Sequence, residues 1–97
     1  MKGVFIAFDQ AHREAVIEVL NHLNCRGFSL IEQMQGRGSK TGEPHYGSHA
    51  WASMNSGIIT MVNDNIVDSL LSSLKKLDED AQMLGLRAFV WNIEQCY

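Results

Sequence analysis

The most regular pattern in this chain is an apolar stripe with helical spacing between residues 66 and 77. Its members recur three and four positions apart, as on one face of an amphipathic helix; they are Ile66, Val67, Leu70, Leu71, Leu74 and Leu77. Asn63 and Asp64 precede this stripe as candidate caps. A second segment, from Ala11 to Leu23, repeats the spacing, with Asp9 as its candidate cap. The chain therefore contains two helices that each bury one face.

Short runs of β-forming apolar residues flank both helical segments. They cover residues 4–8, 28–34, 57–62 and 86–93. The order is β-α-β-β-α-β, and two right-handed crossovers place both helices on one face of a four-stranded antiparallel sheet. We predict an α+β, ferredoxin-like sandwich forming a single domain over residues 1–97. The other sheet face is also apolar and has no cover in this chain, which predicts a partner subunit.

Composition and charge exclude several classes of protein. Hydrophobic residues make up 45% of the chain and charged residues 20%, which is ordinary for a globular protein. The net charge of −3 provides no basic surface for nucleic acid. No apolar run reaches the ~20 residues of a membrane span, and Asp9 follows the first apolar run too closely for a signal peptide. We expect a cytoplasmic protein without nucleic-acid binding or membrane insertion, in which Cys25 and Cys96 are free thiols.

A long connection separates the second and third predicted strands. It runs for 22 residues, from Gln35 to Ser56, whereas structureless connections beyond ~12–15 residues are uncommon and usually functional. Five of the eight glycines lie between Gly36 and Gly57, together with the only proline, Pro44. Glycine clusters indicate unusual backbone angles or close approach of a ligand. The segment is either a binding loop or two strands that extend past the sheet and are joined by a polar tip.

The first part of this segment, Gly36 to Gly42, is a candidate anion site. Its sequence is Gly-Arg-Gly-Ser-Lys-Thr-Gly, and its candidate ligand contacts are Gly36, Arg37, Gly38, Ser39 and Lys40. Backbone amides of glycine turns can point inward toward an anion, while the arginine and lysine supply positive charge. The spacing is not that of a Walker A motif. A flexible polar turn is the alternative interpretation.

Glu43, His45 and His49 fall within seven residues of one another. Carboxylate and imidazole groups are common ligands of zinc and related divalent transition metals. Alternatively, these histidines lie on the surface or contact a partner.

Trp51, near the end of the same segment, could stack on a ligand or pack in a subunit interface. No serine-histidine-acid set can be placed in the chain, and the sequence contains neither HExxH nor GxSxG. We therefore do not expect an enzyme.

Several stretches of the sequence resemble the PII signalling proteins. They are Met1-Lys2 before the first strand, the glycine-rich turn at 36–42, Val-Asn-Asp-Asn-Ile-Val-Asp at 62–68, and Gly-Leu-Arg-Ala-Phe-Val at 85–90. The resemblance implies a homotrimer whose sheets line a central channel. It also implies an adenine nucleotide, ATP or ADP, in the cleft between subunits. The long segment would be the T-loop, which docks on a protein target.

The resemblance extends the list of candidate site residues. Arg87 stands at or beside the basic position of the family's last strand, so it is a candidate ligand contact. The candidate residues with which the long segment would contact a partner are Tyr46, His49 and Trp51. Residues 82–87 contain one glycine and one arginine where the family has a glycine-rich basic B-loop, and no arginines follow Arg87 as they do in the family. We therefore expect a divergent member that binds a small effector.

The sequence is also consistent with two other functions. One is a metal-binding trimer similar to the CutA-like proteins, which share the architecture, with Glu43, His45 and His49 as ligands. The other is a purely structural oligomer whose long segment grips a neighbouring copy.

Overall fold

The structure is a computed structural model that describes residues 1–34, 36–37, 44–45, 55–80 and 85–97. The strands are β1 (Lys2–Asp9), β2 (Phe28–Met34), β3 (Gly36–Arg37), β4 (Pro44–His45), β5 (Asn55–Val62) and β6 (Arg87–Asn92). The helices are α1 (Arg13–His22) and α2 (Val67–Asp80), preceded by the 3-10 turns η1 (Gln10–His12) and η2 (Asp64–Ile66).

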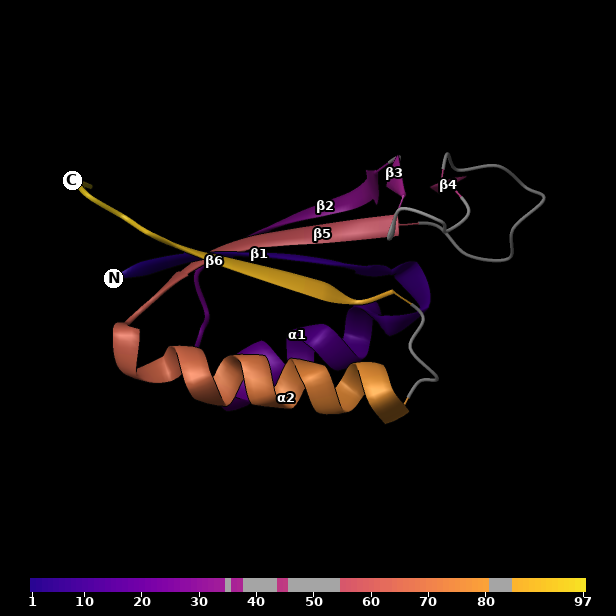
Figure 1. The fold of residues 1–97 in the computed structure, drawn as a ribbon, viewed down its shortest axis with the longest axis horizontal. Coiled ribbons are helices and arrows are strands. Elements are labelled where there is room, and N and C mark those ends of the chain that lie inside the picture. The colour runs from indigo at the N-terminus through magenta and orange to yellow at the C-terminus, as the bar shows by residue number, and fades with distance from the viewer. Residues whose placement is uncertain (35, 38–43, 46–54, 81–84) are drawn as a thin grey trace.

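Four of these strands form one antiparallel sheet in the order β2-β5-β1-β6. Both helices pack on one side of it, as a second layer beneath the sheet in Figure 1. The predicted α+β, ferredoxin-like sandwich is therefore confirmed. No helix in the described part of the chain is long and apolar enough to span a membrane.

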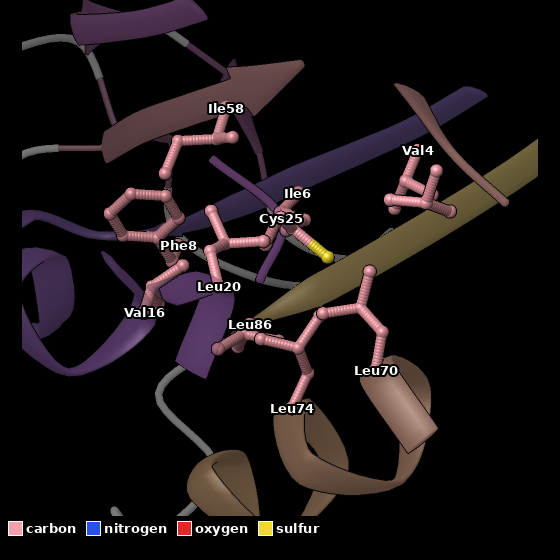
Figure 2. Close-up of a cluster of buried hydrophobic side chains, with 11 residues drawn as sticks. Val4, Ile6, Phe8, Val16, Leu20, Cys25, Ile58, Leu70, Leu74 and Leu86 are labelled. Atoms are coloured by element: carbon pink, nitrogen blue, oxygen red, sulfur yellow. The ribbon is translucent and has the colours of Figure 1, made fainter. Parts of the chain in front are cut away.

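The hydrophobic core lies between the sheet and the helices. Val4, Ile6 and Phe8 alternate along β1 and are fully buried on its helix side. Leu70 and Leu74 project toward them from α2 (Figure 2). The buried residues of β1 are two positions apart, as on one face of a strand, and those of α2 are four apart, as on one face of a helix. The sequence pattern could therefore predict both elements.

The element boundaries differ from the predicted ones mainly at the strand ends. β1 extends over Lys2–Asp9 because it pairs with β5 along its whole length, from Lys2 opposite Val62 to Asp9 opposite Asn55. The first predicted cap is present, since the Asp9 carboxylate accepts a hydrogen bond from the Ala11 amide at 2.8 Å. At the second, Asn63 holds the N-cap position of η2 with an extended backbone, but its side chain makes no cap bond.

The sheet face away from the helices is apolar and exposed. Its large exposed side chains are Ile31, Met61, Phe89 and Trp91. Phe5 and Phe89 lie opposite each other in register, with ring centroids 6.5 Å apart. We call this surface the open face. Among the described residues, no element covers it.

The Trp91 ring lies directly against Gly3 on the open face. A Cβ atom at Gly3 would be 2.4 Å from Cε2 of Trp91. We predict that Gly3→Ala displaces this ring and lowers the free energy of unfolding by about 1–3 kcal/mol, the usual cost of overpacking. Urea denaturation followed by circular dichroism measures the change.

The matched control is Gly27→Ala, because a Cβ atom there has no neighbour within 4 Å. We expect this control to change stability by less than about 1 kcal/mol. Equal effects of the two substitutions would contradict the packing of Trp91 on Gly3.

Candidate ligand-binding site

One end of the sheet gathers the positions that flank the long segment. β1 and β2 end there, while β5 and β6 begin there, as shown by the pairs Asp9 with Asn55, Met34 with Asn55, and Ala7 with Arg87. In Figure 1 this is the end of the sheet from which the trace of the long segment departs. The candidate site therefore belongs to this end.

Two polar contacts fix the strands where the long segment leaves the sheet. The buried Ser56 hydroxyl donates a hydrogen bond to the Glu32 carbonyl at 2.6 Å, which ties β5 to β2. The Glu32 carboxylate forms an ion pair with Arg13 of α1, with 2.8 Å between Oε1 and Nη1. We call Glu32, Met34, Asn55 and Ser56 the loop root. Since Asn55 and Ser56 already belong to β5, the predicted end of the long segment at Ser56 is too late.

A short β3–β4 ladder brings three of the predicted site residues together in the backbone. Gly36 pairs with His45, and Arg37 pairs with Pro44. The candidate anion contacts Gly36 and Arg37 thus lie across from the candidate metal ligand His45. The other predicted residues of this segment lie outside the described residues; they are Gly38, Ser39, Lys40, Glu43, Tyr46, His49 and Trp51.

Arg87 is the first residue of β6 and is half exposed. Its Nη1 donates a hydrogen bond to the Leu86 carbonyl at 2.7 Å. The same nitrogen lies 3.6 Å from Oδ2 of Asp78. The guanidinium is therefore held at the sheet edge while much of it faces solvent.

Asp78 is a residue that the sequence analysis did not identify. It lies in an acidic run that resembles a solvated helix end, yet it is only 7% exposed, whereas Glu79 and Asp80 are exposed. The signal was its spacing, because Leu70, Leu74 and Asp78 are four residues apart and all three are buried. An acidic residue on the buried stripe of a helix indicates a partner, which Asp78 has in the Leu86 amide and in Arg87.

The strands next to Arg37 and Arg87 lie at opposite edges of the sheet. β2, which leads to Arg37, and β6, which begins with Arg87, are the two outer strands of the sheet. Three strand spacings of ~4.8 Å separate these edges by about 14 Å.

The opposite end of the sheet has a cavity of about 270 Å³ that contains none of the predicted site residues. Among its lining residues are Met1, Cys25 and Met61. Burial raises the pKa of the Cys25 thiol, which disfavours the reactive thiolate. Nearby, the N-terminal ammonium lies 2.8 Å from Asp64 and, by hydrogen bonding to it, lowers the pKa of that carboxyl. These contacts hold the chain start to η2 and do not form a second ligand site.

The candidate metal site stays a prediction. The described residues contain no group of three histidine, cysteine, aspartate or glutamate side chains that could hold a metal ion. Glu43 and His49 are outside those residues, and of His45 only the backbone pairing is described.

Comparison with known proteins identifies the family. The family described as nitrogen regulatory protein P-II matches residues 1–97. The chain therefore belongs to the P-II family, which confirms the resemblance inferred from its motifs. A search of curated proteins finds no match.

Solved structures agree with this assignment at the level of the fold. CPII, a nitrogen regulatory PII-like protein from Thiomonas intermedia K12 bound to ADP, AMP and bicarbonate, has a TM-score of 0.78 and 22% identity, over 95% of this chain and 84% of that one. Its apo form has a TM-score of 0.73 and 20% identity, over 95% and 87%. A PII-like signalling protein from Thermus thermophilus has a TM-score of 0.67 and 21% identity, over 95% and 85%.

The loop root generates a second prediction. Ser56→Ala removes the hydroxyl that ties β5 to β2 and leaves the Glu32 carbonyl without this partner. We expect the free energy of unfolding to fall by about 1–2 kcal/mol. Amide hydrogen exchange should also become faster in residues 32–34 and 55–57, which the bond holds together.

The control for this variant is Ser72→Ala on the exposed face of α2. Alanine favours a helix slightly over serine, so this change should be neutral or weakly stabilising. Unchanged exchange at the loop root in Ser56→Ala would contradict the role given to the Ser56–Glu32 bond.

Proposed function

We propose that this chain is a trimeric regulatory protein that binds a small anionic effector in clefts between subunits and signals through the segment between β2 and β5. An adenine nucleotide is the first candidate effector. The role is regulatory rather than catalytic, as in the P-II family to which the chain belongs, and we place it in the cytoplasm.

The open face is the observation that carries the proposed assembly. Phe89 is 57% exposed, Met61 49% and Trp91 42%. Met61 lies in β5, and Phe89 and Trp91 lie in β6; Phe5 of β1 lies between them, so the patch spans three adjacent strands. Apolar patches of this kind on a small domain mark contacts with other chains. A threefold arrangement of identical sheets would bury the open face of every copy at once.

The position of the two arginines supports a site between copies. β2, which leads to Arg37, and β6, which begins with Arg87, are opposite edges of the sheet, and both arginines stand at the same end of it. In a closed ring, the β6 edge of one copy faces the β2 edge of its neighbour, so one arginine from each could reach the same ligand. Guanidinium groups bind phosphate through paired charge-assisted hydrogen bonds, which suits a nucleotide.

The structural neighbours supply the candidate ligand. CPII structures contain ADP, AMP and bicarbonate or ADP and bicarbonate. ADP is therefore the first nucleotide to test with this chain. In the proposed mechanism, the bound effector favours one conformer of the segment between β2 and β5, and so changes the surface that a protein target meets.

Calorimetric titration with ADP tests the proposal. We expect the wild-type protein to bind, and Arg37→Ala to weaken binding about tenfold or more, because a hydrogen bond to a charged group contributes about 1.5–3 kcal/mol. The assembly should persist, since Arg37 lies outside the four-stranded sheet that carries the open face.

Arg26→Ala is the matched control, because Arg26 is exposed just before the start of β2, at the opposite end of the sheet, where it contacts Asn24. It should leave ADP affinity unchanged. Equal affinity in Arg37→Ala and the wild type would contradict the proposed site. If the purified wild-type protein does not bind ADP but contains a transition metal, and the His49→Ala variant lacks that metal, the result would instead support the metal-binding trimer.

A further inference from the structure

A buried carboxylate beside a candidate ligand contact requires a physical explanation. The Asp78 side chain is 10% exposed, and burying a carboxylate is unfavourable unless charges and hydrogen bonds compensate it. The neighbouring Glu79 and Asp80 avoid that cost by remaining exposed. The partners of Asp78 therefore determine what it does.

The two oxygens of Asp78 have different partners at the start of β6. Oδ1 accepts a hydrogen bond from the Leu86 amide at 3.2 Å. Oδ2 lies 3.6 Å from Nη1 of Arg87. The first contact joins the last turn of α2 to the backbone that leads into β6, and the second is an ion pair with a half-exposed guanidinium.

Arg87 has a second tether and spare donors. Its Nη1 also donates to the Leu86 carbonyl at 2.7 Å, so its position does not depend on Asp78 alone. A guanidinium has five N–H donors, and within the described residues this group makes only that one hydrogen bond. With 47% of the side chain exposed, the remaining donors are available to an anion from solvent.

A phosphate that binds Arg87 must compete with the carboxylate already beside it. The two negative groups would share one guanidinium, and their mutual repulsion lowers the affinity for the incoming anion. Since the Leu86 carbonyl also holds the arginine, removing the charge of Asp78 should leave Arg87 in place and make it a stronger anion contact.

We propose that Asp78 competes with the effector for the Arg87 guanidinium at the start of β6 and so sets the affinity of the site for phosphate-bearing effectors. The inference rests on the proposed function in that it takes Arg87 as an effector contact. It adds a specificity determinant: Asp78 reduces binding of the charged phosphates and leaves binding of the uncharged nucleoside unchanged.

The test compares ADP and adenosine binding by the whole chain and its Asp78→Asn variant. Asparagine keeps an oxygen that can accept the Leu86 amide but removes the charge beside Arg87. We expect Asp78→Asn to bind ADP about three- to fivefold more tightly, the upper range for an ion pair with one exposed partner. Adenosine affinity should not change, because adenosine carries no phosphate.

Two further variants isolate the pair. Glu79→Gln makes the same change in net charge one residue away, on an exposed side chain, and should leave ADP affinity as in the wild type. In an Arg87→Gln background, Asp78→Asn should no longer tighten ADP binding, because the guanidinium through which it acts is gone. Circular dichroism checks that each variant is folded, and Asp78→Ser replaces Asp78→Asn if the latter is not.

The outcomes separate this inference from the proposed function. ADP binding by the wild type alone tests the proposed function. The ratio of the ADP affinities of Asp78→Asn and the wild type tests the role of Asp78. Unchanged or weaker ADP binding in Asp78→Asn overturns the inference, as does equal tightening in Glu79→Gln or with adenosine. If the wild type does not bind ADP, binding gained in Asp78→Asn supports the role of Asp78, and its absence overturns it.

Discussion

The burial of only one face of a two-faced apolar sheet is the constraint on which the rest of this structure depends. Val4, Ile6 and Phe8 fill the side that the two helices cover, while Phe5 and Phe89 lie on the side left open. Both helices lie on the same side of the sheet, so they form one covering layer. In the proposed assembly, other copies of the chain cover the open face and complete the proposed site.

The sheet order extends this dependence to ligand binding. Because β2 and β6 are the outer strands, the proposed site, in which Arg37 and Arg87 contact one ligand, forms where two copies meet. The loop root and the Asp78–Arg87 pair then have related tasks at the two edges. Ser56 fixes the strands from which the long segment departs, and Asp78 fixes the entry to β6. Each uses a buried polar group, whose contacts are costly to break.

Periodic features of the fold could be predicted from the sequence, because alternation and helical spacing directly reflect burial. The β-α-β-β-α-β order, the Asp9 cap and the apolar open face follow from such patterns. Asp78 could have been found by the same reasoning, since it continues the row of Leu70 and Leu74, but its acidic neighbours obscured the spacing. Asn63 holds the N-cap position of η2 without a side-chain bond, while the adjacent Asp64 pairs with the N-terminal ammonium, a contact between distant parts of the sequence that no local pattern indicates.

The site could be predicted only in part. The glycine-rich turn marked Gly36 and Arg37, and the structure adds their pairing with Pro44 and His45. The predicted ferredoxin-like topology already places the strand that leads to Arg37 and the strand of Arg87 at opposite edges, and the structure confirms that order. The chemistry of Gly38 to Lys40, Tyr46, His49 and Trp51 remains a prediction from residue types and family resemblance.

Native mass spectrometry of the wild-type protein, with and without ADP, tests the central claim most directly. The account predicts a mass of three chains, and up to three bound nucleotides when ADP is present. A monomer would contradict it, because the open face would then be exposed to water with nothing to bury it. A trimer that binds no nucleotide would preserve the assembly and contradict ADP as the effector.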